Sequence, residues 1–181
     1  MKNIQRLLLA FFFLSAILLV VIAYKSGLKE FQPEKDSLFK ITFTYPASWT
    51  WEKDRPFDEI PPGEEPPPSE LIVFKNAPIS IQVYKPSNPQ VLMQKWMDAY
   101  LGAVANMLSY DNTFQIDDHN ARWLTVVYPP QNTSASHVDE GIYLLTEDRF
   151  YTIDLSISEA EMDGRLHKQF EELIKSIKVL P

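Results

Sequence analysis

The chain of 181 residues is long enough for one domain with a hydrophobic core, and 45% of its residues are apolar. Its formal net charge is −7, and the first 30 residues hold four of the 17 Lys and Arg but only one of the 24 Asp and Glu, which leaves 13 basic against 23 acidic side chains in the remainder. Because a domain this acidic repels phosphate backbones, we expect no nucleic-acid partner. The absence of cysteine excludes disulfides, thiol catalysis and cysteine-ligated metals.

The N-terminal segment 1–25 is predicted to be a signal anchor or transmembrane helix. Residues 7–23 are almost entirely apolar and have basic residues on both sides. A 17-residue helix spans roughly 26 Å, slightly less than a bilayer core of about 30 Å. A cleaved signal peptide stays open because residues 21–23, Val-Ile-Ala, match a cleavage site, and a buried core helix is a third reading. The short basic leader favours an inside N-terminus, so we expect a single-pass protein of the cytoplasmic membrane with its C-terminal domain extracytoplasmic, or secreted if cleaved.

Residues 26–38 are polar and predict a tether, and residues 39–181 predict one α+β domain. Apolar and polar residues alternate at the start of this domain, which is typical of a strand that has one buried face. The apolar members of the alternation are Phe39, Ile41, Phe43 and Tyr45. A turn then leads to a second short strand with Trp49 and Trp51 on one face.

Residues 54–69 are rich in proline and acidic residues. Proline cannot donate a hydrogen bond to a sheet and repulsion between like charges extends the chain, so this segment predicts an exposed loop. Its plain interpretation is a long hairpin loop. The alternative is a docking loop for a basic or aromatic groove on another protein.

A helix is predicted over residues 88–108, with Asn88 as its N-cap and Pro89 in the first turn. Its apolar stripe includes Trp96 and Tyr100, which could form a ligand box, although core packing is the default interpretation. The second predicted helix follows Ser158 and Glu161, which fit a capping box. Its apolar face comprises Met162, Leu166, Phe170, Leu173 and Ile177.

The remaining periodic segments predict strands over residues 71–75, 79–84, 113–116, 121–128, 141–146 and 150–157. The order of strands, helix, strands and helix indicates an α+β fold, with a largely antiparallel β-sheet flanked by helices.

Two pieces of this layout resemble the PsbP-like superfamily, which includes extrinsic subunits of photosystem II and many bacterial proteins of unknown function. They are Phe-Lys-Ile-Thr-Phe-Thr-Tyr-Pro-Ala-Ser-Trp at residues 39–49, and the strand, turn and strand of residues 143–157 with the helix that follows. The resemblance implies an α/β/α sandwich over about residues 38–180 that usually binds proteins and has no conserved catalytic machinery. It implies no site residues. The chain shows no transit peptide, which favours a bacterial envelope protein.

The three histidines predict no strong site. His119 follows two aspartates in a predicted solvated turn, and His137 with Asp139 supplies only two metal ligands on one strand face. His167 is predicted to lie in a solvated row of charges on the last helix. We find no Gly-x-Ser-x-Gly elbow, no Ser-x-x-Lys and no glycine-rich phosphate loop, so we expect no enzyme, no metal and no cofactor.

The function expected from the sequence is that of a non-enzymatic, membrane-anchored domain that binds an envelope or membrane protein in an assembly or accessory role. The expected partner-binding residues are Trp49, Trp51, Pro61, Pro62, Glu64, Glu65, Pro66, Pro67, Pro68 and Trp123. The first alternative is a module that binds a small hydrophobic or cationic ligand with the aromatic side chains between sheet and helix. The second is a hydrolase with a site around His119 or His137.

Overall fold

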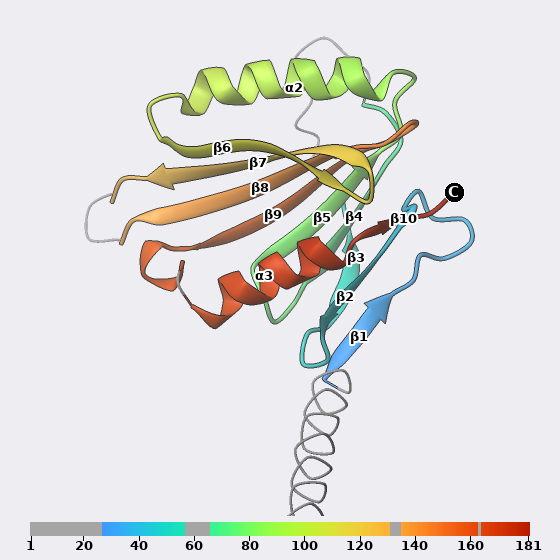
Figure 1. Ribbon diagram of the computed structural model, residues 1–181, viewed down its shortest axis with the longest axis horizontal. Helices are drawn as coiled ribbons and strands as arrows, with labels where there is room; N and C mark the ends of the chain where they lie inside the picture. Colours follow the sequence, from blue (N-terminus) through green and yellow to red (C-terminus); the bar gives the residue numbers. More distant parts are fainter. Residues whose placement is uncertain (1–26, 57–65, 131–134, 163) are drawn as a thin grey trace, which may run out of the picture.

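The computed structural model describes residues 27–56, 66–130, 135–162 and 164–181, which form an α+β fold of two antiparallel sheets and two α-helices (Figure 1). The fold class predicted from the sequence is confirmed. The expected signal anchor of residues 1–25 lies outside the described residues, and no helix within them is long and apolar enough to cross a bilayer.

The larger sheet has seven strands in the order β3-β4-β5-β9-β8-β7-β6, and every neighbouring pair is antiparallel. The strands are β3 (Trp51–Asp54), β4 (Ser69–Phe74), β5 (Ile79–Tyr84), β6 (Leu108–Ile116), β7 (His119–Tyr128), β8 (His137–Leu145) and β9 (Phe150–Ser158). Because β3 and β4 pair directly, the proline-rich segment joins the two strands of a hairpin, as its plain interpretation predicts.

The fold also contains a smaller sheet of three strands, one of which falls within the predicted tether. Its central strand is β2 (Ile41–Pro46), which pairs with β1 (Leu28–Phe31) and with β10 (Lys178–Val179). The prediction of a tether over residues 26–38 is therefore wrong for β1. The Phe31 side chain explains why, because it is only 3% exposed and stacks on Phe43 at 4.8 Å between ring centroids. Burying this ring stabilises a strand in a segment that is otherwise polar.

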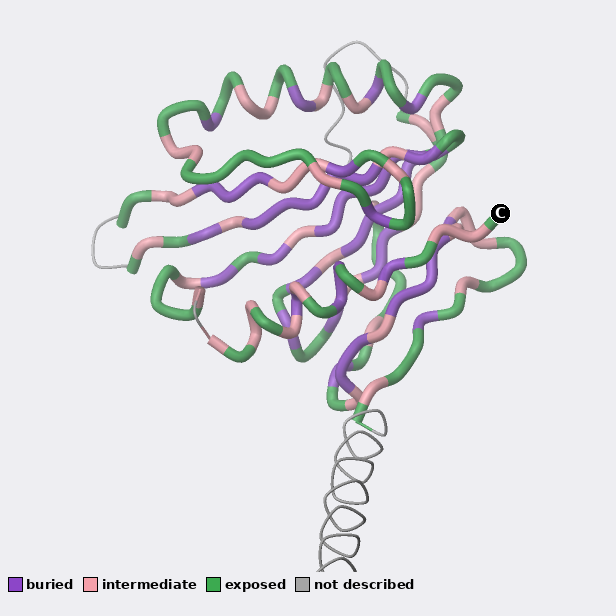
Figure 2. Tube along the Cα trace, viewed as in Figure 1, coloured by how far each residue is buried: buried purple, intermediate pink, exposed green. Residues whose placement is uncertain are grey.

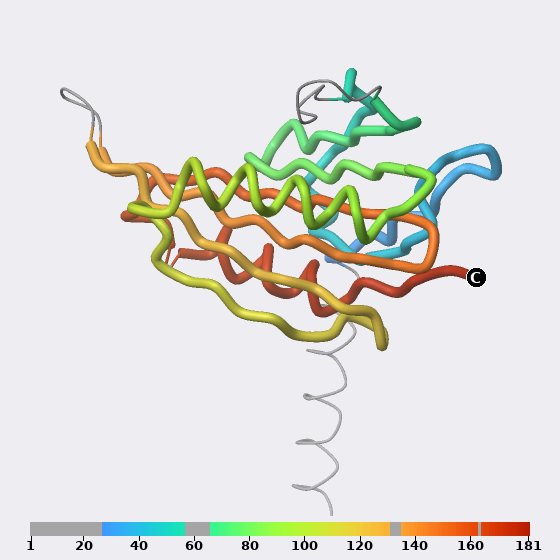
Figure 3. Tube along the Cα trace, turned by 90° about the horizontal axis from the view of Figure 1, so that it is seen from above, coloured from blue at the N-terminus to red at the C-terminus, as the bar shows by residue number. Residues whose placement is uncertain are grey.

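The large sheet is covered on both faces (Figures 1 and 2). On one face, α3 (Arg165–Ser176) and β2 pack over a core that includes Ile81, Ile142 and Ile153. On the other face, α2 (Pro89–Val104) lies over β8 and β9 (Figure 3). Leu92 and Met97 of α2 belong to one buried cluster with Phe150 of β9. Successive residues of a strand point to opposite faces, so β8 and β9 supply side chains to both layers.

Both predicted N-capping motifs are present in the structure, but α2 and α3 have other bounds than the sequence predicts. The Asn88 side chain accepts a hydrogen bond from the amide of Val91 at 3.2 Å, which fixes the start of α2, and α2 ends at Val104, before the predicted residue 108. The capping box of Ser158 and Glu161 begins a short 3-10 helix, η1 (Glu159–Glu161), and α3 starts only at Arg165.

The predicted turn before His119 is a tight hairpin between β6 and β7. Asp117 and Asp118 both have positive φ, 48° and 66°, as a two-residue hairpin turn of this type requires. The Asp117 carboxylate accepts hydrogen bonds from the amide of Val179 at 2.8 Å and from the Lys178 ammonium at 3.1 Å. These bonds lower the pKa of Asp117 and tie the turn to β10.

Candidate ligand-binding cleft

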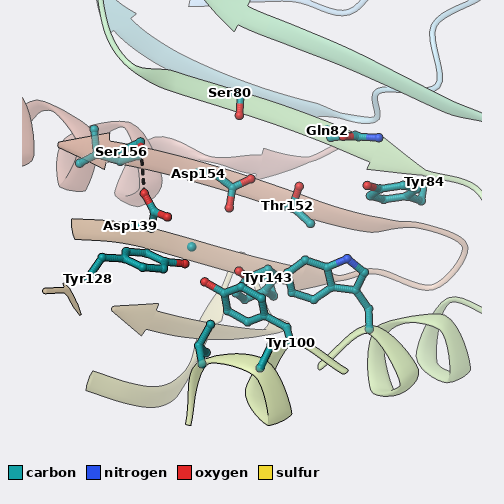
Figure 4. A pocket seen from close by; sticks show the side chains of 15 residues that line it. Ser80, Gln82, Tyr84, Tyr100, Tyr128, Asp139, Tyr143, Thr152, Asp154 and Ser156 are labelled. Carbon is teal, nitrogen blue, oxygen red and sulfur yellow. Dashed lines mark hydrogen bonds between the residues drawn. The ribbon is translucent and has the colours of Figure 1, made fainter. Parts of the chain in front are cut away.

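A cleft of about 500 Å³ lies between α2 and the face of the large sheet that α2 covers (Figure 4). Its volume falls in the range usual for small-molecule sites. Strands β5, β8 and β9 form its floor, and α2 with the end of β7 forms its wall. The lining residues are Ser80, Gln82, Tyr84, Trp96, Tyr100, Ala103, Val104, Tyr128, Asp139, Gly141, Tyr143, Thr152, Asp154, Leu155 and Ser156.

The wall of the cleft is aromatic because Trp96 and Tyr100 stand one helical turn apart on the sheet-facing side of α2. Their rings stack at 4.9 Å with an interplanar angle of 23°, and Trp96 lies 4.9 Å from the Tyr143 ring on β8. The Tyr100 and Tyr128 hydroxyls point toward one another in Figure 4, beside Tyr143. Three elements thus bring aromatic rings to one end of the cleft.

The floor of the cleft carries two aspartates, one on each of two neighbouring strands. Asp139 pairs with Ser156 in the register of β8 and β9, and Asp154 pairs with Gly141. The four positions therefore share one face of the sheet, and both carboxyl groups point into the cleft (Figure 4). Ser156 Oγ donates a hydrogen bond of 2.6 Å to Asp139 Oδ1.

The electrostatic character of the cleft is negative. Among the described residues that line it, none is Lys, Arg or His. Burial raises the pKa of the Tyr143 and Tyr100 hydroxyls, and the charges of Asp139 and Asp154 raise both further, because ionising a phenol beside a carboxylate brings like charges together. The tyrosines therefore stay neutral and can supply hydroxyl groups and ring faces to a ligand.

Gly141 gives the cleft its shape. A Cβ added at Gly141 would lie 2.7 Å from Cζ of Tyr143 and closer still to its hydroxyl, so the phenol lies directly over the glycine backbone. Any larger residue at position 141 would displace the Tyr143 ring. Gly141 therefore leaves room for the Tyr143 ring in the floor of the cleft.

His137 lies near the cleft and tests the hydrolase prediction. Its Nε2 atom is 2.6 Å from Ser156 Oγ and 2.9 Å from Asp139 Oδ1. In a catalytic triad, the serine and the carboxylate engage different nitrogens of the imidazole. Here both engage Nε2, so the aspartate does not orient the ring for proton transfer from the serine. His119 instead places Nδ1 2.8 Å from the Asp117 carbonyl oxygen, in the β6–β7 turn.

Of the three expected partner-binding tryptophans, Trp49 is buried and Trp51 and Trp123 are partly buried, and their contact with a partner stays a prediction. Trp49 is 4% exposed and packs edge-on against Phe74, and Trp51 packs against Phe31. Trp123 lies edge-on to Phe170 of α3 at 6.1 Å. Trp49 belongs to the buried core, and Trp51 and Trp123 are partly buried and pack against it.

The proline-rich docking loop stays a prediction. Pro61, Pro62, Glu64 and Glu65 lie outside the described residues. Of the three prolines that follow, Pro66 and Pro68 are exposed and Pro67 is half-buried.

The prediction of a solvated His167 is wrong. His167 Nε2 lies 3.1 Å from Oε1 of Glu140, a carboxylate on β8 that is 2% exposed. Glu140 faces the opposite side of β8 from Asp139, toward α3 rather than toward the cleft. Among the described residues, neither Glu140 Oε2 nor Trp123 Nε1 has a hydrogen-bond partner. No group of three or more His, Asp or Glu within the described ranges could hold a metal ion.

Replacing Glu140 with glutamine is expected to flatten the pH dependence of the unfolding free energy. Burial raises the pKa of Glu140, His167 opposes this, and Glu171 adds to it. A carboxyl with a raised pKa contributes its full stability below its unfolded value, 4.5, and loses it as pH rises through the folded pKa. Urea unfolding from about pH 4 to about pH 8 should show Glu140→Gln gaining stability relative to the parent chain as pH rises. A constant difference would contradict the buried placement.

The sequence predicts the aromatic half of the cleft, because the helical stripe with Trp96 and Tyr100 is an alternative ligand box. It does not predict the acidic half, since its patterns do not single out Asp154 and favour Asp139 only as a metal ligand beside His137. The sequence of β9 nevertheless contains a pattern that indicates the acidic half. Thr152, Asp154 and Ser156 alternate with apolar core residues, so one face of this strand is polar. Because α2 covers that face, its polar side chains line a cleft.

A comparison with protein-family models finds no match, and a search of curated proteins finds none. Among solved structures, the cyanobacterial PsbP protein (CyanoP) of Synechocystis is 17% identical, with a TM-score of 0.50, and the match covers 84% of this chain and 92% of that chain. LpqN of Mycobacterium tuberculosis, described as involved in cell envelope biogenesis, is 9% identical, with a TM-score of 0.51 and coverage of 85% and 92%. The chain therefore has the PsbP-like fold that its sequence predicts.

Proposed function

We propose that this chain is a non-enzymatic binding domain of the cell envelope whose cleft between α2 and the large sheet takes a small organic cation. The observation that carries the proposal is the lining of the cleft: two aspartates below an aromatic wall, without a basic residue among the described lining residues. The proposal develops the ligand-binding alternative of the sequence analysis, and the lining of this cleft supports it.

The two parts of the lining favour a cation for different reasons. A carboxylate forms strong, charge-assisted hydrogen bonds with an ammonium group. Aromatic faces attract cations by about 0.5–1 kcal/mol at exposed sites and by about 2 kcal/mol when water is excluded. The stacked rings of Trp96 and Tyr100 also offer an apolar surface to the carbon chain of such a ligand.

Isothermal titration of the full-length chain in detergent with n-butylammonium chloride tests this function. We expect saturable binding that Asp154→Asn weakens roughly tenfold, since the variant removes one of two charges from the cleft at nearly constant volume. Asp98→Asn is the matched control, because Asp98 is an exposed residue of α2 that is absent from the cleft lining. Equal affinities for the two variants, or no binding by the parent chain, would contradict the proposal.

The non-enzymatic part of the proposal rests on the contacts of His137. Ser156 and Asp139 engage the same imidazole nitrogen, an arrangement that does not activate a serine nucleophile. The resemblance to PsbP-like proteins supports the same conclusion, as this superfamily usually binds partners without catalysis.

The envelope location in the proposal combines two observations. Residues 7–23 form an apolar run of the length expected for a signal anchor, and one protein of similar fold, LpqN, is described as involved in cell envelope biogenesis. A reporter enzyme that functions only after export should be active when it is fused after Pro181. Activity of a reporter that functions only in the cytoplasm, with no activity of the first reporter, would contradict the orientation.

A further inference from the structure

A second cleft, of about 310 Å³, lies on the face of the large sheet that α3 covers. Its floor is a row of side chains across three strands, because Tyr110 of β6 is opposite Thr125 of β7 and Thr125 is opposite Glu140 of β8. Met162, which follows η1, and His167 of α3 complete the lining. Since α2 and α3 lie on opposite faces of the sheet (Figure 1), this cleft is separate from the one that is proposed to bind a cation.

Two buried polar atoms of the lining residues have no hydrogen-bond partner among the described residues. They are Nε1 of Trp123, which can only donate, and Oε2 of Glu140, which accepts when the carboxyl is ionised. His167 Nε2 lies 3.1 Å from the other carboxylate oxygen, Oε1, so it does not pair with Oε2. Trp123 is two residues from Thr125 on β7 and is therefore a diagonal neighbour of Glu140 on the same face. Buried polar groups are normally paired, so a donor and an acceptor without partners side by side indicate a missing group.

We propose that this cleft binds a small aromatic alcohol whose hydroxyl group accepts a hydrogen bond from Trp123 Nε1 and donates one to Glu140 Oε2. A hydroxyl group suits the pair because it contains both a donor and an acceptor. An ammonium group would leave the indole without an acceptor, and an ether would leave the carboxylate without a donor. A water molecule can form the same two hydrogen bonds, so the apolar part of the lining is the evidence for a larger alcohol.

The apolar part of the lining suits an aromatic ring. The Tyr110 side chain is 48% exposed, and its ring is at 89° to the Trp123 ring, with 6.4 Å between the centroids. Aromatic rings pack well edge-to-face, and the thioether of Met162 also makes favourable contacts with them. A ring bound here would shield Tyr110 from water. Because Trp123 Nε1 and Glu140 Oε2 are buried, binding requires a lining side chain to move, and Met162, which is half-buried and has three rotatable bonds, can do so.

Titration of the ¹⁵N-labelled full-length chain in detergent with phenol tests the inference. The chain has four tryptophans, so the indole N–H signal that is missing in Trp123→Phe belongs to Trp123. We expect phenol to shift this signal downfield and saturably, because the indole N–H gains an acceptor. Methoxybenzene accepts a hydrogen bond but donates none, so it should bind at least roughly tenfold more weakly. Equilibrium dialysis gives the free concentrations, because detergent takes up both compounds.

Two variants compare the same chemical change inside and outside the cleft. Trp123→Phe should weaken phenol binding, measured by dialysis, roughly tenfold, because the donor is lost. Trp51→Phe is the matched control and should bind phenol as the parent chain does, since Trp51 lines neither cleft.

Three results would overturn the inference. They are equal binding of phenol and methoxybenzene by the parent chain, equal weakening of phenol binding in both variants, and no binding of phenol, which would leave water as the group that pairs with both atoms. The comparison of the two ligands needs only the parent chain, so it stands even if Trp123→Phe does not fold. None of these results depends on whether the other cleft binds n-butylammonium.

Discussion

Replacing Phe31 with alanine is expected to lower the free energy of unfolding by roughly 3–5 kcal/mol, the usual cost of truncating a buried phenylalanine. Phe31 stacks on Phe43 at 4.8 Å and meets Phe39 and Trp51 edge-on at 5.6 and 5.3 Å. The Phe31 side chain anchors β1 in the core between the two sheets. Removing its ring leaves a cavity that is lined by the three neighbouring aromatic rings.

Urea or thermal unfolding of the full-length chain measures this effect. Lys29→Ala is the matched control on the same strand, because Lys29 is exposed, and its free energy should change by no more than about 0.5 kcal/mol. If Phe31→Ala were as mild as Lys29→Ala, residues 28–31 would be the tether that their polarity suggests, and the three-stranded sheet would be wrong.

Replacing Gly141 with alanine is expected to damage both the stability and the binding activity of the protein. The new methyl group would meet the Tyr143 ring at 2.7 Å, a distance that forces the side chain or the strand to move. Such overpacking costs about 1–3 kcal/mol of unfolding free energy. Because Tyr143 forms part of the aromatic wall, its displacement should also weaken n-butylammonium binding by more than roughly tenfold.

Gly102→Ala makes the same chemical change without the clash. Gly102 lies in α2, and a Cβ added there meets no atom within 4 Å. Alanine is the better helix former, so this variant should gain about 0.5–1 kcal/mol and bind as the parent chain does. Calorimetric titration and unfolding of both variants check the pair. Normal binding by Gly141→Ala would show that the Tyr143 position does not matter to the ligand.

The strands and helices were predictable where local patterns coincide with tertiary burial. The alternation of Phe39, Ile41, Phe43 and Tyr45 matches four buried side chains, and Asn88 caps its helix as expected. The β1 strand was not predictable in this way. Its four residues carry two charges and only one fully buried ring, so the stabilising contacts come from β2 and from Trp51, which are distant in sequence.

The candidate site was harder to predict because it depends on pairing register. Asp139 and Asp154 approach one another only because β8 and β9 pair with Gly141 opposite Asp154. A shift by one residue would turn one carboxylate toward α3 and remove the pair from the cleft. Likewise, the buried contact of His167 with Glu140 depends on how α3 crosses the sheet, which the periodicity of one helix does not specify.

The central claim is that the space between α2 and the sheet binds an organic cation, and intermolecular NOEs test it most directly. An isotope-filtered NOE spectrum of the full-length chain in detergent, saturated with n-butylammonium, reports which rings contact the ligand. We predict NOEs from the ligand methylene groups to the ring protons of Trp96 and Tyr143. NOEs to Trp123 instead, which packs against Phe170 of α3 on the other face of the sheet, or none to any aromatic ring, would contradict the claim.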